Sequence, residues 1–318
     1  MSNLIRLLLL LFALSQPDRL SGFSPVNTHE AVEIGGIQQW ISIQGKNSSD
    51  PVLLFLHGGP GNSSMNYGDR FTRSLQKHFV VVQWDQRETG MTAKLNHTNK
   101  PLTVARMESD AVEMIKYLCS RFSHVKVYLM GHSWGGFLGL KVAAAHPELI
   151  EAYFAISPMV YQLESERRSL EWMKDTAQKS NNQQELNELA TVNIPFQNGE
   201  QLYFHRKWLS KGMGTSLPPR TYVETWAKKW LALFNEASRV NFFETAPEIR
   251  CPLYFFVGSN DYQTYFKLTE EYFHAVKAEK KDLFWFTNSS HNLNLTEPGK
   301  LQEIVISVLT SKNNGIDK

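Results

Sequence analysis

The stretch Gly131-His132-Ser133-Trp134-Gly135-Gly136 places a hydroxyl nucleophile between glycines, at the spacing of a sharp turn. An apolar run over 125–130 precedes it, and a helical pattern over 137–145 follows. A serine in a strand–turn–helix element projects its hydroxyl above the sheet edge, and small neighbours leave room for that turn. The pattern predicts Ser133 as a catalytic nucleophile and the backbone N–H of Trp134 as a donor to an oxyanion.

A serine hydroxyl needs a base to remove its proton, and that base needs an acid to orient it. Asp261 and His291 each follow a late apolar run, where a strand is expected to end. Their order after Ser133, acid and then histidine, predicts a triad of Ser133, Asp261 and His291. Asp282 is a weaker candidate for the acid because it begins a predicted strand instead of following one.

A glycine-rich loop, His57-Gly58-Gly59-Pro60-Gly61, follows the buried apolar run 52–56. Glycine lets the backbone approach a substrate closely because no side chain intervenes. Negative charge on a tetrahedral intermediate requires preorganised donors. We therefore expect the second oxyanion donor to come from this loop.

Apolar runs alternate with helical patterns along most of the chain, which predicts a mostly parallel α/β sheet flanked by helices. Only helical patterns occur over 158–245, which predicts a helical cap over the carboxyl ends of the strands, where open α/β sheets bind ligands. The expected organisation is an N-terminal segment at 1–25, a core at 26–157 and 246–318, and a cap at 158–245.

Composition excludes several classes of function. The chain has 318 residues with 33 basic and 31 acidic side chains, a net charge of +2, which does not favour nucleic acid or an anionic membrane surface. No Cys/His cluster has metal-ligand spacing, so we expect no metal and no cofactor. We expect a small-molecule or short-peptide substrate and no membrane span, and the sequence leaves the oligomeric state open.

The first residues bear on location. Arg6 precedes an apolar run over 7–14, and Ala13-Leu14-Ser15 offers small residues for cleavage, as in a signal peptide. The run is too short to span a bilayer. It predicts export to a secreted or periplasmic location, with a cytoplasmic enzyme as the alternative.

Three motifs together resemble the prolyl aminopeptidase (proline iminopeptidase) branch of the α/β-hydrolases: HGGPG at 57–61, DQR at 85–87 and GHSWGG at 131–136. The resemblance covers the core and is faint in the cap. It implies an α/β-hydrolase fold with an inserted helical cap, and a serine peptidase that releases an N-terminal residue, often proline, through an acyl-enzyme. It implies oxyanion donors at Gly59 and Trp134.

The resemblance also implies cap glutamates that bind the free amino terminus. The segment 230–238 looks similar to the family's stretch, in which such a glutamate follows a Trp-x-x-Trp pair, with Phe234 replacing the second Trp. We therefore expect Glu236 to bind the substrate amine, with Glu164 as a second ligand. A solvated helix face or a salt bridge within the cap is the alternative. Departures from the family after DQR, at His132 and at Asn292 bear on the preference for proline.

Other functions use the same core. An esterase, lipase-like enzyme or amide hydrolase acting on small molecules would have the same triad and differ in the cap. A binding protein on this fold would be expected to lose a triad member or an oxyanion glycine, and Ser133, Asp261, His291 and Gly59 are all present. An epoxide hydrolase or dehalogenase would need a carboxylate where Ser133 stands.

Overall fold

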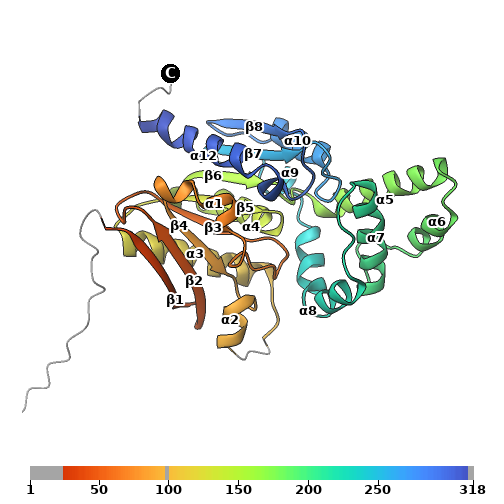
Figure 1. The fold of residues 1–318 in the computed structure, drawn as a ribbon, viewed down its shortest axis with the longest axis horizontal. Coiled ribbons are helices and arrows are strands. Elements are labelled where there is room, and N and C mark those ends of the chain that lie inside the picture. The colour runs from red at the N-terminus through yellow and green to blue at the C-terminus, as the bar shows by residue number, and fades with distance from the viewer. Residues whose placement is uncertain (1–23, 97–99, 314–318) are drawn as a thin grey trace, which may run out of the picture.

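A central eight-stranded sheet, in the order β1-β2-β4-β3-β5-β6-β7-β8, organises the computed structural model (Figure 1). The structure describes residues 24–96 and 100–313, so the predicted signal-like segment lies outside the described residues. The strands are β1 (Val26–Ile34), β2 (Ile37–Gly45), β3 (Val52–Leu56), β4 (Val80–Asp85), β5 (Val127–His132), β6 (Ile150–Ile156), β7 (Leu253–Gly258) and β8 (Lys281–Phe286). β2 pairs antiparallel with β1 and β4, and all the other pairs are parallel, which confirms the predicted fold class.

Both faces of the sheet are covered, which is why its inner strands are continuous apolar runs. Alternate side chains of β3 enter opposite layers. Val52, Leu54 and Leu56 pack in the larger core, with α3 and α4. Leu53 and Phe55 pack in the smaller core, with α1 and α12. The core helices are α1 (Asp69–Thr72), α2 (Gly90–Leu95), α3 (Val104–Phe122), α4 (Trp134–Ala145), α10 (Phe266–Ala275), α11 (Leu293–Thr296) and α12 (Pro298–Asn313).

Two short helical segments depend on contacts from elsewhere in the fold. The segment 66–78 contains only the short α1 and a 3₁₀ turn at Leu75–Lys77, although its sequence is compatible with one longer helix. One reason is tertiary, because the Ser74 N–H donates to Gln302 Oε1 at 2.8 Å instead of to a carbonyl of its own helix. The helix α2 was not expected, because six residues are too short to show a period. It is held by the carboxylate of Asp85, which accepts from the Met91 N–H at 2.8 Å.

Most of the helices between β6 and β7 stand together at one end of the sheet, and α9 lies beside β7 and α10 (Figure 1). They are α5 (Gln162–Lys179), α6 (Gln183–Ala190), α7 (Gly199–Gly212), α8 (Arg220–Ser238) and the short α9 (Phe242–Thr245). The Trp226 indole on α8 donates to the carbonyl of Pro60, just beyond β3, at 2.8 Å. Lys229 on the same helix pairs with Glu88, beyond β4, at 3.0 Å. These contacts place α8 over the carboxyl ends of the strands. Within the described residues, no helix is long and apolar enough to cross a membrane.

Candidate active site

Ser133 lies in the turn between β5 and α4, with φ 57° and ψ −113°. A positive φ is unfavourable for a residue with a side chain, so the surrounding packing must hold it. The Ser133 N–H donates to the Ile156 carbonyl at 3.0 Å. A Cβ at Gly131 would overlap the carbonyl of Gly135, and a Cβ at Gly135 would overlap the carbonyl of Leu56. The two glycines therefore permit the strained turn that presents the serine.

The acid and the histidine of the predicted triad are paired. Asp261 Oδ2 lies 3.0 Å from His291 Nδ1, and both side chains are buried. Burial would raise the pKa of Asp261, but His291 and hydrogen bonds from Thr264 outweigh it and lower the pKa to about 2. The carboxylate is therefore ionised and can only accept, so His291 Nδ1 carries the proton and Nε2 is left as a base.

Two cavities meet at Ser133 in the described part of the chain. One, the cap cavity, holds about 200 Å³ and is bounded on its outer side by α5, α7 and α8. The other, the base cavity, holds about 210 Å³ and includes His291 in its wall. Gly59, Asn62, Ser133 and Gln263 line both cavities. The serine thus stands at a junction, with the histidine on one side and the cap on the other.

The glycine loop after β3 lies beside the serine. Gly59 has φ +118°, and a Cβ there would come within 2.6 Å of the Gly61 nitrogen, so only glycine fits. Trp134 is the first residue of α4. The first N–H groups of a helix have no acceptor within it, so this N–H is free of the helix's own bonding. Backbone donors from two separate elements therefore flank Ser133.

Gln86, the middle residue of the DQR motif, joins these two elements. Its side-chain N–H donates to the carbonyl of His57 at 3.1 Å, and its Oε1 accepts from the Trp134 indole at 2.9 Å. Its backbone N–H donates to His57 Nε2 at 3.2 Å, which leaves Nδ1 of that ring to donate to the Gly58 carbonyl. Sequence reasoning used this motif only for resemblance and missed its structural role, which is to hold the glycine loop after β3 against the start of α4.

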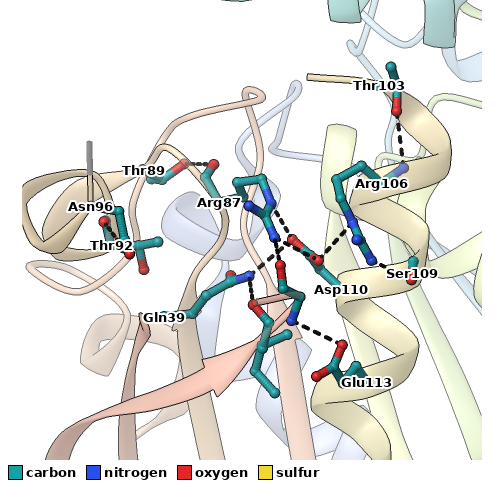
Figure 2. Close-up of polar contacts among 12 residues, drawn as sticks. Gln39, Arg87, Thr89, Thr92, Asn96, Thr103, Arg106, Ser109, Asp110 and Glu113 are labelled. Atoms are coloured by element: carbon teal, nitrogen blue, oxygen red, sulfur yellow. Dashed lines mark hydrogen bonds and ion pairs between the residues drawn. The ribbon is translucent and has the colours of Figure 1, made fainter. Parts of the chain in front are cut away.

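Arg87, the last residue of the DQR motif, anchors the loop after β4 through an ion pair with Asp110 on α3 (Figure 2). Its Nε lies 2.6 Å from Asp110 Oδ2, and the Asp110 side chain is completely buried. Gln39 donates to the same carboxylate at 3.0 Å, and Arg87 also donates to the Gly35 carbonyl at 2.9 Å. The ion pair therefore ties the loop after β4 to α3 and to the β1–β2 hairpin. The DQR motif thus supports the site, and its three residues line neither the cap cavity nor the base cavity.

His132, the last residue of β5, contacts the loop that carries His291. Its Nε2 lies 2.9 Å from the backbone carbonyl of His291, and the two rings are 4.9 Å apart at their centroids. Burial, followed by the nearby His291, lowers the pKa of His132 to about 3. The ring is therefore neutral near pH 7 and donates from Nε2. The only sequence signal for this contact was a histidine where the resembled family usually has glycine.

The structure does not bring Glu236 or Glu164 to the cap cavity. Glu236 Oε1 accepts from the backbone N–H of Val104, at the start of α3, at 3.2 Å. Glu164 pairs with Arg168 at 2.9 Å and with Arg167 at 3.6 Å. Neither side chain contributes to the wall of the cavity. The sequence pattern placed both on helices, but it did not determine which way each helix turns its glutamate.

The polar wall of the cap cavity is made by other side chains, among them Gln162 and Arg206. Behind them lies Glu166, which is 1% exposed and whose Oε2 accepts from Arg206 Nη1 at 2.7 Å. Burial would raise the pKa of Glu166, but Arg206 outweighs it and the pKa is lowered. Among the described residues, no carboxylate lines this cavity and no cluster of side chains has the composition of a metal site.

Residues 51–261 match the family defined by the alpha/beta hydrolase fold, and the chain belongs to that family. The chain is 27% identical over 296 residues to the Bacillus subtilis protein named "Probable aminopeptidase YbaC", covering 84% of this chain and 91% of that protein. It is 29% identical over 126 residues to the proline iminopeptidase of Lactobacillus helveticus, covering 39% and 41% of the two.

The fold agrees with these similarities. The proline iminopeptidase of Mycobacterium smegmatis superposes with a TM-score of 0.63 and 15% identity, covering 91% of this chain and 100% of that one. An esterase from Exiguobacterium antarcticum superposes with a TM-score of 0.61 and 17% identity, covering 89% and 100%. At such identities the likeness concerns the fold alone. The protein is a hydrolase of the alpha/beta hydrolase family.

Proposed function

We propose that this hydrolase is a serine aminopeptidase that releases the N-terminal residue of a small or short-peptide substrate. The observation that carries the chemistry is the placement of Ser133 at the junction of two cavities, with the Asp261–His291 pair beside one of them. A serine, a histidine and an ionised carboxylate are the groups that general-base nucleophilic catalysis requires.

In the proposed reaction, His291 Nε2 takes the proton of the Ser133 hydroxyl as the serine oxygen attacks the scissile carbonyl. The backbone N–H groups of Gly59 and Trp134 stabilise the resulting oxyanion. His291 then gives the proton to the departing amine, which leaves an acyl-enzyme on Ser133. Water, deprotonated by the same histidine, releases the acyl group. Asp261 stabilises the imidazolium at both steps.

The two cavities divide the substrate between them. Because His291 must reach the departing amine, the leaving group occupies the base cavity, which His291 lines. The acyl part therefore occupies the cap cavity, whose volume of about 200 Å³ suits a group the size of one residue. This division supports release of a single residue, and so does the similarity to a relative named as an aminopeptidase over most of both chains.

A second candidate is an esterase or amide hydrolase that acts on small molecules with uncharged acyl groups. The observation that favours it is the cap cavity itself, where the described lining residues include Arg206 and no carboxylate. A buried ammonium without a counter-ion is costly, whereas an uncharged acyl group has no such requirement.

A two-part experiment tests the proposal. A fluorophosphonate probe should label the protein, and mass spectrometry should find the label on Ser133. A panel of aminoacyl arylamides and matched uncharged acyl esters then separates the two candidates. Turnover of the arylamides with a free amine supports the aminopeptidase, and turnover of the esters alone supports the second candidate. Absence of labelling at Ser133 contradicts both.

A further inference from the structure

Arg206 on α7 belongs to the wall of the cap cavity. Leu202 and Ser210, about one turn before and one turn after it on the same helix, also line the cavity, so this face of α7 is turned toward it. The Arg206 side chain is 13% exposed, whereas that of its partner Glu166 is 2% exposed and does not line the cavity. The accessible part of this ion pair is therefore the guanidinium.

The hydrogen bonds of Arg206 use three of its N–H groups. A guanidinium has five, all in one plane. One N–H on each terminal nitrogen is donated to a carboxylate oxygen of Glu166. The other N–H of Nη1 is donated to His205 Nδ1, 2.9 Å away. The two that remain are on Nε and Nη2, and they lie side by side on the opposite edge of the guanidinium from the His205 contact.

These two N–H groups have no acceptor among the described residues. Arg206 Nε makes no hydrogen bond there, and it is not among the unpartnered atoms that the protein covers completely. No carboxylate of the described chain lines the cavity to serve as its acceptor. Two parallel donors on a rigid plane match an sp² oxygen, which has two lone pairs. A substrate without an acceptor covers these donors and leaves them unpaired, which is unfavourable.

The charges around Arg206 favour one kind of acceptor. Glu166 already neutralises the guanidinium, and burial lowers the pKa of His205 to about 4, so that ring is uncharged near pH 7. Apolar side chains, among them Met159 and Val223, form other parts of the wall. A substrate carboxylate would place a second negative charge against a single cation in a covered site, whereas a carbonyl oxygen adds no charge. The acceptor that fits is an uncharged carbonyl oxygen.

We propose that Arg206 determines acyl-side specificity by donating hydrogen bonds from Nε and Nη2 to an uncharged carbonyl oxygen of the released residue. This inference rests on the proposed function. An N-terminal 5-oxoproline has this chemistry, because its ring is close to proline in size, carries a lactam carbonyl and has no ammonium. Such a residue needs no carboxylate in the cavity, where neither Glu236 nor Glu164 lies. Peptides that begin with this kind of residue are therefore the substrate class that the cap cavity favours.

The first test uses two uncharged substrates that differ in one oxygen, 3-oxocyclopentanecarbonyl 4-nitroanilide and cyclopentanecarbonyl 4-nitroanilide. The parent enzyme should have a kcat/KM at least about tenfold higher for the oxo compound, because the other compound leaves the donors of Arg206 unpaired. Arg206→Lys keeps a cation beside Glu166 but replaces the planar pair of donors with a single ammonium. It should lower the ratio of the two kcat/KM values to below about threefold.

A second variant removes the two charges together. Glu166→Gln combined with Arg206→Met leaves no buried carboxylate that needs a counter-ion and no donor at the position of the guanidinium. Its ratio should also fall below about threefold. The control is Arg168→Lys, at an arginine of α5 that pairs with Glu164 and does not line the cavity. The control should keep the ratio of the parent. Partial unfolding lowers both rates and cancels in the ratio, so a ratio that stays at the parent value in both Arg206 variants overturns the inference.

A second comparison separates this inference from the proposed function. The parent enzyme should have a kcat/KM at least about tenfold higher for 5-oxoprolyl 4-nitroanilide than for prolyl 4-nitroanilide. Cleavage of the prolyl compound at an equal or higher rate overturns the inference and leaves the proposed function standing. Cleavage of none of the four arylamides overturns both.

Discussion

The two walls of the site differ in how they are built. The core wall consists of backbone: the strained turn at Ser133, the loop at Gly59 and the first N–H of α4, all supported by Gln86 and Arg87. The cap wall consists of side chains, such as Gln162 and Arg206, presented by separate helices. Backbone geometry leaves a sequence motif because only certain residues permit it. A helix face that points into a cavity leaves no comparable motif.

The largest effect should come from removing the hydroxyl of Ser133, the proposed nucleophile, in the core wall. Ser133→Ala should lower kcat by about 10⁴-fold or more while circular dichroism and thermal unfolding stay close to the parent. His291→Ala should do the same, and the double variant should lose little more, because the residues act as one unit. Activity of Ser133→Ala within about tenfold of the parent would show that the nucleophile is elsewhere.

The cap wall should respond to acid through His205. Burial, ahead of the other causes, lowers the pKa of His205 from 6.5 to about 4. Because the folded-state pKa is depressed, its contribution to stability is complete above about pH 6.5 and is lost as the pH falls toward 4. The free energy of unfolding should decrease by about 3 kcal/mol over this window from this group. Urea unfolding at several pH values measures the loss.

The matched variant for that measurement is His205→Gln, which cannot take up a proton. It should show a loss smaller than the parent's by about 2 to 3 kcal/mol between roughly pH 7 and pH 4. Parallel losses in the parent and His205→Gln would mean that this histidine does not control the acid stability of the cap.

A substitution at Gln86 tests whether the core wall acts on catalysis separately from the cap wall. Gln86→Leu removes the hydrogen-bond partner of the His57 carbonyl and of the Trp134 indole, and so loosens the two segments proposed to supply the oxyanion donors. It should lower kcat by about 10- to 100-fold with a small change in KM. The loss should be the same for prolyl 4-nitroanilide and for cyclopentanecarbonyl 4-nitroanilide, which replaces the ring N–H with CH₂. Selective loss of one substrate in Gln86→Leu would mean that the walls do not act separately.

The smallest effect is expected at Glu236. Its carboxylate accepts from the Val104 N–H at the start of α3, and glutamine retains an acceptor oxygen there. Glu236→Gln should therefore change the free energy of unfolding by about 0.5 kcal/mol, through the lost charge at a helix N-terminus. Its kcat/KM on free-amine substrates should stay within about twofold of the parent's. A larger loss, confined to free-amine substrates, would restore this residue as an amine ligand.

The sequence by itself determined the sheet and the positions of the turns that form the core wall. Continuous apolar runs such as 52–56 and 253–258 are typical of strands buried on both faces, and their alternation with helical patterns predicts a mostly parallel sheet. Gly131, Gly135 and Gly59 mark places where the backbone allows no side chain, so the residue types alone indicate those turns. The sequence also places Ser133, Asp261 and His291 after the apolar runs that form β5, β7 and β8.

Only the tertiary structure decided what the cap presents to the substrate. Helices α5, α7 and α8 are separated by turns and pack on one another through nonlocal contacts, and the rotation of each about its axis depends on that packing. Glu236, Glu164 and Gln162 were all polar positions on predicted helices. In the structure Glu236 binds the start of α3, Glu164 pairs with neighbouring arginines, and Gln162 lines the cavity. Successive residues of a helix point in directions about 100° apart, so a small rotation of the helix changes which side chain faces the cavity. The hydrophobic period of the sequence does not fix that rotation.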